Sequence, residues 1–464
     1  MKTNSGVSTQ HPEYAKNLPL WDRCIDASEG QHAVHAKTTL YLPRLTDEKD
    51  EEYKARLKRT PFFNAVWRTI SGLKGMIFRK PADAVYPASS QRFVDNVDMA
   101  GTPLNLFVQG ITEQCLKVGR CGILIDYPSV ANAGNLTVAE SELLGLRPLM
   151  ARYDAKAIIN WRTKRIAGSE VLTQVVLTEQ QAADDSEFGH DSITVYRVLD
   201  LTEAGYRQRL FKRVDDKDIQ IGEDMYPQMS GRNLSRIPFV FVGVDSLSPA
   251  VDSPPLLDLV DMNFAHYMVS ADYEHACHFS GLPTLFISGH SQSPEDKAIY
   301  IGGTAANCLR DPQAKAYFVE TQGDFPALRM NLEDKKAQMA VLGARMLESQ
   351  KAQVEAAETQ KTRQSGEQSQ LAAMTEVINI AVTRALQVFM AWAGMSGEVK
   401  YTLNKDFVPV KMNAQELTAL VGSWQAGAIS NQTLFDNLQE GEIIMQAITF
   451  EEEQERISSQ GPTL

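Results

Sequence analysis

Apolar residues recur along the 464-residue chain first with the spacing of helices, then with that of strands, and then with that of helices again. In the first section, residues 46–59 carry acids in the first turn and bases in the last, which suits a helix dipole. Two more helices are predicted, one beginning at Pro61 and one running from Pro103 to Gly119, each with proline in its first turn. Residues 1–45 contain three prolines and are expected to form an irregular arm.

The middle section, residues 120–245, has the alternation and the β-branched and aromatic residues of strands. The strand candidates are GILID (122–126), VLTQVVLTE (171–179), SITVYRVLDL (192–201), YRQRLFKRV (206–214) and IPFVFVGV (237–244). We therefore predict a sheet that is continuous with the preceding helices in one α/β domain.

Two long helices that surround a compact insertion are predicted in the last section. The first begins at Ser253-Pro254-Pro255 and ends near Phe279, which makes it roughly 39 Å long at ~1.5 Å per residue. The second begins near Pro326, and the insertion between them contains glycines, prolines and the strand candidates LPTLFISG and KAYFVE. A long amphipathic helix is then predicted from Leu371 to Gly394, and short helices are predicted from Met412 to Phe450.

Between these helices, residues 351–370 read KAQVEAAETQKTRQSGEQSQ and contain one sizeable apolar residue, Val354. A helix draws most of its stability from packing an apolar stripe, so a helix that is polar on all sides needs a lumen or another chain beside it. The first long helix, in turn, carries apolar residues on more than one face. In a single copy of the chain those apolar faces would be exposed to water, which predicts neighbouring copies beside it in a ring or bundle.

Composition narrows the classes of function. The chain is 43% hydrophobic and 22% charged, no apolar run approaches the ~18–20 residues of a membrane span, and the N-terminus lacks the apolar core of a secretion signal. We expect the protein to remain in the cytoplasm of the cell that makes it, with its five scattered cysteines reduced. The net charge of −12 argues against a sequence-reading DNA-binding protein, although an acidic wall can guide DNA by repelling it.

The sequence contains no GxxxxGKS/T, GxSxG or HExxH motif. In VGRCGILID the glycines precede the strand, so a helix C-cap followed by a strand is favoured over a dinucleotide turn. His275 and His278, with Cys277 and Asp272 nearby, come nearest to a metal site, but tetrahedral zinc needs four ligands and we favour a solvated or interface face. No catalytic, cofactor-binding or metal-binding residue is predicted.

Seven segments, in order over nearly the whole chain, match one known family. They are YLPRLTDEKDEEYKARLKRTPFFNAVWRTISGLKGMIFRKP (41–81), GRCGILIDYP (119–128), RYDAKAIINWR (152–162), IPFVFVG (237–243), PPLLDLVDMNFAHYMVSADYEHACHFSGLPT (254–284), MAVLGARMLE (339–348) and NQTLFDNLQEGE (431–442). With these segments the chain resembles the portal proteins of tailed bacteriophages, and more narrowly a portal-like family of phage and prophage genomes. The segments are structural signatures and include no catalytic residue.

The resemblance implies an α+β fold that is mainly α: the portal fold, with an α/β wing, a two-helix stem, a small α/β clip insertion and a helical crown. The implied parts are an N-terminal arm (1–29), the wing (30–252), two stem helices (253–281 and 326–348), the clip between them (282–325), a tunnel loop with the start of the long helix (349–370), wing and crown helices (371–450) and an acidic C-terminal tail (451–464).

The resemblance also implies a dodecameric ring at one capsid vertex, through which double-stranded DNA is packaged and ejected. The implied partners are further copies of the chain, DNA bound without sequence specificity, the terminase large subunit, the major capsid protein and the head–tail adaptor, with no membrane, cofactor or enzymatic activity. The implied location is the virion, and the host cytoplasm during assembly. One set of residues is expected to face the DNA channel: Lys351, Gln353, Glu355, Lys361 and Arg363. A second set, in the clip, is expected to face the terminase or the adaptor: Glu295, Asp296, Lys297, Arg310 and Asp311.

Two alternatives stay open at this point. One is an adaptor ring of the phage neck that never contacts the motor; adaptors are usually shorter and lack paired stem helices, so the insertion 282–325 favours the portal. The other is a hydrolase with a pair of carboxylates, which no motif supports. A large ring would suit the portal and a monomer would suit the enzyme.

Overall fold

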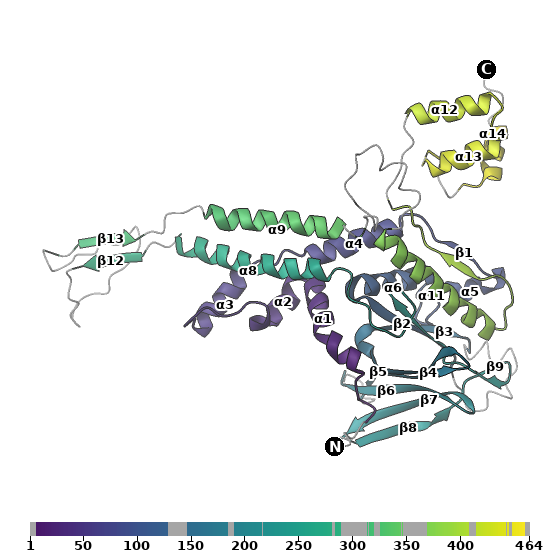
Figure 1. Cartoon of the computed structure of the whole chain (residues 1–464), viewed down its shortest axis with the longest axis horizontal. Helices are drawn as coiled ribbons and strands as arrows, with labels where there is room; N and C mark the ends of the chain where they lie inside the picture. Colours follow the sequence, from purple (N-terminus) through teal and green to yellow (C-terminus); the bar gives the residue numbers. More distant parts are fainter. Residues whose placement is uncertain are drawn as a thin grey trace. The chain divides into compact units, whose positions relative to one another are not determined.

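The structure is a computed structural model that describes residues 6–128, 146–183, 190–215, 217–280, 284–288, 313, 315–319, 325–344, 346, 369–407, 414–441, 443–444 and 448–459. The chain divides into two compact units, and each is described by itself (Figure 1). The larger unit comprises Met1–Gly75 and Ala82–Leu403, and the smaller unit comprises Met76–Pro81 and Asn404–Leu464.

The larger unit begins with helix α1 (Pro12–Glu29) and the short helix α2 (Gln31–Ala36), so the prediction of an irregular arm over residues 1–45 is wrong. Pro12 lies in the first turn of α1, where the missing N–H costs no hydrogen bond. Pro19 lies inside the helix, but Trp21 and Cys24 on the following turn are fully buried. Burial of this apolar face outweighs the propensity that the prolines suggested.

The next helices are α3 (Asp50–Arg59), α4 (Ala65–Ile77) and α6 (Leu104–Val118). The last two confirm the predicted helices, except that α4 begins later than Pro61, because Asn64 and not Thr60 accepts a hydrogen bond from the backbone of Trp67. Gly119 ends α6 in the left-handed conformation at φ 78°, as the C-cap prediction required. Short elements between them are η1 (Thr38–Leu40), η2 (Ala88–Ser90) and α5 (Gln91–Val94).

Two antiparallel sheets form the centre of the larger unit. One has the order β11-β2-β3 and consists of β11 (Phe239–Gly243), β2 (Arg120–Asp126) and β3 (Leu149–Asp154). The other has the order β4-β5-β6-β7-β8 and consists of β4 (Ile158–Ile166), β5 (Ser169–Ala182), β6 (Ser192–Thr202), β7 (Gly205–Val214) and β8 (Lys217–Met225). All five predicted strands are therefore confirmed. Smaller pairs join β9 (Gln228–Met229) to β10 (Arg232–Asn233) and β1 (Asp83–Val85) to β14 (Lys400–Thr402).

Helix α11 (Gln370–Trp392) packs against the three-stranded sheet and confirms the predicted amphipathic helix (Figure 1). By length and composition alone it qualifies as a candidate membrane span, contrary to the expectation that no such run exists. Leu371, Ile378 and Phe389 are fully buried in the protein, which identifies α11 as a core helix of this unit.

Helix α8 (Leu257–Ser280) leaves the sheets, and helix α9 (Pro326–Ala344) returns alongside it (Figure 1). Between them in sequence, β12 (Thr284–Ser288) and β13 (Lys315–Val319) pair as antiparallel strands. The prediction of two long helices with strands in the insertion is confirmed, with the start of α8 shifted to Leu257.

The smaller unit consists of helices α12 (Ala414–Gln425), α13 (Asn431–Glu440) and α14 (Phe450–Ser459). Phe435 and Phe450 pack edge to face with ring centroids 5.5 Å apart, which joins α13 to α14. The acidic residues of the predicted tail begin α14, where three glutamates in the first turn suit the helix dipole. The prediction of short helices in this region is confirmed.

Candidate functional site

The pair of helices α8 and α9 is the first candidate site, because it is long, projects from the sheets and packs against few other elements of the unit. Helix α8 contacts α1, α3 and α9. Its buried residues recur every three or four positions, as expected for one helix face: Leu259, Val260, Asn263, Phe264, His266, Tyr267, Ser270 and Ala271. The part of α8 that follows Ala271, residues 272–280, has no fully buried residue.

Asn263 fixes the base of α8 to the start of α4. Its side-chain amide donates to the carbonyl of Phe63 over 2.9 Å, and its oxygen accepts from the amide of Ala65 over 3.1 Å. The next residue, Phe264, stacks on Tyr41 with ring centroids 4.2 Å apart. The helix pair therefore stands on an anchored base, because Asn263 adds two hydrogen bonds to the backbone groups of Phe63 and Ala65, which also bond to each other over 2.8 Å.

Helix α9 has two apolar stripes, and only one of them is buried. Leu332 and Met339 are the only buried residues among the 19 of this helix. Met330 and Val341 are 64% and 55% exposed. At ~100° per residue, Met330 and Val341 lie within ~20° of each other and on the opposite side of the helix from Leu332 and Met339. Ala337 and Asp334, also exposed, lie between them on the same side of the helix, so the outer face of α9 is uncovered and apolar apart from one carboxylate.

Helix α8 also exposes large apolar side chains. Met268 and Phe279 are 43% and 58% exposed, and they lie within ~20° of each other around the helix. The helix contains four carboxylates and no lysine or arginine. An exposed surface that combines large apolar side chains with one sign of charge is typical of an interaction surface.

The histidines of α8 do not form a metal site. Among the residues that the structure describes, no group of three His, Cys, Asp or Glu side chains is placed to hold a metal ion. His275 packs edge to face on Phe279, with ring centroids 4.6 Å apart. Burial of the imidazole lowers its pKa, and the positive charges of Arg56 and Arg59 lower it further. His266 is buried as well, and both its burial and the positive charge of Lys336 on α9 lower its pKa. Both histidines are therefore held neutral at the helix interface.

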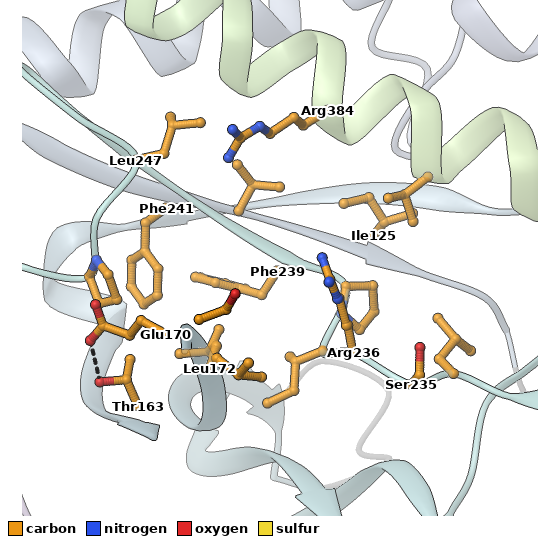
Figure 2. A pocket seen from close by; sticks show the side chains of 18 of the residues that line it. Ile125, Thr163, Glu170, Leu172, Ser235, Arg236, Phe239, Phe241, Leu247 and Arg384 are labelled. Carbon is orange, nitrogen blue, oxygen red and sulfur yellow. Dashed lines mark hydrogen bonds between the residues drawn. The ribbon is translucent and has the colours of Figure 1, made fainter. Parts of the chain in front are cut away.

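A cleft beside α11 is the second candidate site, and Figure 2 shows its lining. Its volume is about 1070 Å³, and it lies between β11, the β4–β5 hairpin and α11. Arg236 and Arg384 extend into it (Figure 2), and Arg232 lines it as well. Its single carboxylate, Glu170, accepts a hydrogen bond from the Thr163 hydroxyl over 2.6 Å. We call this site the arginine cleft.

The walls of the arginine cleft are apolar and aromatic. Phe239 and Phe241 pack edge to face at 4.9 Å, and Ile125 and Leu172 complete the wall (Figure 2). A second cavity of about 660 Å³ adjoins the cleft, since both are lined by Thr163 and Glu170.

Behind these walls lies a buried cation. The Arg120 guanidinium is 4.0 Å from the ring centre of Trp161 and 4.8 Å from that of Phe241, with the side chain 2% exposed. None of its three nitrogens has a hydrogen-bond partner in the described part of the chain. Burial lowers the pKa of Arg120 to about 10, and Asp252 opposes that shift.

The residues predicted from the sequence for the channel (Lys351, Gln353, Glu355, Lys361, Arg363) and for the clip surface (Glu295, Asp296, Lys297, Arg310, Asp311) lie outside the described residues, and their predictions stay predictions. Sequence reasoning missed the arginine cleft. Its arginines come from segments about 150 residues apart, and only the fold brings them together. The single signal in the sequence was Arg384, the only basic residue in a mainly apolar helix.

Comparisons with known proteins give three results. Residues 255–393 match the family model described as "Domain of unknown function (DUF4055)", which covers both long helices and α11. No curated protein matches the chain. Among solved structures, the chain is similar to a chain in the neck of a native GTA particle computed with C12 symmetry (13% identity, 82% of this chain and 92% of that chain covered, TM-score 0.39).

Two further structures are similar at the same level. One is a chain in the neck of an empty GTA particle computed with C6 symmetry (13% identity, 86% and 95% covered, TM-score 0.38). The other is a chain in the virion of a native gene transfer agent (GTA) particle (12% identity, 87% and 97% covered, TM-score 0.37). TM-scores at this level do not establish a common fold, so the function is inferred from the sequence and geometry of this chain.

Proposed function

We propose that the chain is a structural protein of the head–tail connector of a phage-like particle, and within it the portal. Copies of the chain form a ring of twelve at one capsid vertex, through which double-stranded DNA is packaged and ejected. In this proposal α8 and α9 are the stem, and the segment between them is the clip that meets the terminase and later the adaptor. The fold is then the α+β portal fold, the ring belongs to the virion, and the protein has no enzymatic activity.

One observation carries the proposal: the outer face of α9. An isolated helix is marginal in water, and a helix in a protein is stabilised mainly by packing an apolar face. Helix α9 buries two residues and exposes Met330 and Val341 on the opposite side. Side-by-side copies would cover this stripe with the exposed apolar residues of a neighbouring stem, Met268 and Phe279 of α8. An isologous pair would satisfy one neighbour only, whereas two different faces meeting head to tail close a ring.

The charge of α8 supports a DNA conduit. A channel must let DNA slide in both directions without holding any register, and each neutralised phosphate adds salt-dependent affinity that would trap it. A helix with four carboxylates and no lysine or arginine does not grip a polyanion. The same surface argues against a DNA-binding protein of the sequence-reading kind.

The test is negative-stain imaging of the purified chain together with a variant that carries Met330→Asp and Val341→Asp. The unaltered protein is expected to form annular particles, and the variant is expected to remain a single folded copy. Asn331→Asp with Gln338→Asp is the matched control, because it adds the same two charges at exposed positions about a quarter-turn away from the stripe. Annular particles from the doubly substituted variant would contradict the assignment of this stripe to the ring interface.

A further inference from the structure

The arginine cleft runs along the free edge of β11. In the described part of the chain, β11 pairs with β2 and with no other strand, since the sheet has the order β11-β2-β3. Three successive residues of β11, Phe239, Val240 and Phe241, line the cleft. Successive side chains of a strand point to opposite faces of its sheet. A cavity that is lined from both faces extends past the edge of the strand, so a molecule in the cleft can reach the main chain of β11.

The edge of β11 that borders the cleft has backbone groups without partners. The carbonyl of Pro238 accepts a hydrogen bond from β2 over 2.9 Å, and the amide of Gly243 donates over 3.1 Å to the bend that follows the strand. Because these directions alternate along an antiparallel strand, the N–H and C=O groups of Phe239 and Phe241 point away from β2. No described residue forms a hydrogen bond with these outward groups. Both residues are buried, and buried backbone groups are nearly always paired in native proteins, so this edge is suited to an added strand.

The charge of the cleft favours an acidic ligand. Arg232, Arg236 and Arg384 line it together with one carboxylate, Glu170, whereas the whole chain has a net charge of −12. The three arginines are exposed, and none of them forms an ion pair with a described residue. The adjoining cavity is lined by a further arginine and a lysine. Because guanidinium groups form strong, charge-assisted hydrogen bonds with carboxylates, the lining selects acidic side chains.

The two sides of β11 offer different contacts to an added strand. Phe241 packs on Trp161 of β4 with ring centroids 6.3 Å apart, so the aromatic side of β11 faces the second sheet. Helix α11 packs on the three-stranded sheet from the opposite side (Figure 1), and Arg384 extends from it into the cleft (Figure 2). Neighbouring strands place their alternate side chains on the same two faces. An added strand would therefore present one set of side chains to Arg384 and the alternate set to Phe241 and Leu172.

We propose that the arginine cleft binds an extended acidic segment of another protein, which adds to β11 as a strand. In this segment carboxylates alternate with apolar residues. The carboxylates meet Arg384 on the α11 side, and the apolar residues meet the aromatic side of β11. Main-chain hydrogen bonds supply the affinity, and the alternate side chains supply the specificity. One copy of the chain contains the whole site, so the proposal does not depend on the formation of a ring.

The phosphates of a nucleic acid fit this edge less well than a peptide does. Phosphate oxygens accept hydrogen bonds from the groups that bind them, so they would leave the outward carbonyls of Phe239 and Phe241 without a donor. A peptide strand provides a donor for each carbonyl and an acceptor for each N–H. Its own carboxylates then reach the arginines.

The first test measures the fluorescence anisotropy of a fluorescein-labelled octapeptide of alternating glutamate and valine with the purified full-length protein. Saturable binding is expected. Two control peptides of the same length separate charge from strand pairing: one has lysine in place of every glutamate, and the other has all glutamates before all valines. Both controls are expected to bind about tenfold more weakly. Equal binding of the alternating and the block peptide, or no binding of the alternating peptide, overturns the proposal.

Methylation of the peptide nitrogens tests the main-chain hydrogen bonds themselves. The backbone groups of alternate residues face the neighbouring strand, so N-methyl groups on one set of residues block pairing, whereas those on the other set point away from β11. The alternating peptide is therefore methylated either on its glutamates or on its valines. Loss of binding with one set and retention with the other is expected. An equal effect of the two sets overturns the assignment of β11 as the docking strand.

A substitution in the cleft locates the bound peptide. Arg384→Glu is expected to weaken binding of the alternating peptide about tenfold. Arg329→Glu, on α9 at an exposed position that lines neither cavity, is the matched control and is expected to leave binding unchanged. Equal binding by the Arg384→Glu variant and the unaltered protein overturns the proposal. Binding of a short DNA duplex that is tighter than that of the peptide and is lost in Arg384→Glu would assign the cleft to nucleic acid and overturn it as well.

Discussion

Asn263 offers the sharpest test of how the stem helix is held, because one buried side chain satisfies two backbone groups of another helix. Its amide and oxygen bond to Phe63 and Ala65, which lie about 200 positions away in the sequence, and the residue is fully buried. Asn263→Ala removes both of these bonds and leaves the Phe63 carbonyl and the Ala65 N–H with only the bond that they make to each other over 2.8 Å. Each lost hydrogen bond contributes ~0.5–1.5 kcal/mol, so the expected loss of stability is roughly 1–3 kcal/mol.

Amide hydrogen exchange at Ala65 measures this effect at its source. At ~1.4 kcal/mol per factor of ten, the protection of that amide is expected to fall about 5- to 140-fold in Asn263→Ala. Asn263→Asp keeps an acceptor for the Ala65 amide but buries a carboxylate, so it retains more of that protection while overall stability falls. Asn437→Ala on α13 is the control, because its solvent-accessible amide bonds only to Thr433, and a change within about 0.5 kcal/mol is expected. Ala65 protection within twofold of the unaltered protein would refute the two-bond anchor.

Two further predictions concern buried charges. Glu48 forms two hydrogen bonds with Arg56 at 2.7 and 2.8 Å, both side chains are buried, and the Arg56 guanidinium lowers the pKa of Glu48. The stabilisation from this pair is therefore present above the unfolded pKa of ~4.3 and is lost as the pH falls through the lower folded pKa. In a plot of the urea midpoint against pH, Glu48→Gln should therefore weaken the fall in stability at acid pH. The same fall as in the unaltered protein would count against the pair. Arg120→Met is expected to change the free energy of unfolding by no more than about 1 kcal/mol, because the guanidinium is buried without a hydrogen-bond partner among the described residues. Trp161→Ala, which removes the ring beside this guanidinium, is expected to lower the free energy of unfolding by ~3–5 kcal/mol. A loss above ~2 kcal/mol in Arg120→Met, read from the same urea curves, would show that the cation has a stabilising partner.

The local rules of sequence predicted the elements whose stability is local. Gly119 stops α6 and turns the chain into β2, as the glycine before GILID indicated, and the alternating residues of 171–179 and 192–201 pair as β5 and β6. The arm over residues 1–45 failed because proline content was weighed without the burial of Trp21, which only tertiary packing reveals. Strand β8 escaped notice for a related reason: it is exposed along most of its length and has no apolar face to detect.

The candidate sites, too, could be predicted from local sequence patterns only in part. The two stripes of α9 can be read from the spacing of Met330, Leu332, Met339 and Val341, but which stripe is covered depends on where α8 lies. The arginine cleft forms only where β11, the β4–β5 hairpin and α11 meet in the fold, so no local sequence pattern predicts it. The sequence therefore pointed to neighbouring copies, while the surfaces for them required the fold.

The most direct test of the account is the mass of the assembled protein by native mass spectrometry. A closed ring of twelve 51.5 kDa chains has a mass of about 620 kDa, and the account predicts this species, dissociating when the outer stripe of α9 is charged. A mass of 51.5 kDa at every protein concentration would contradict it.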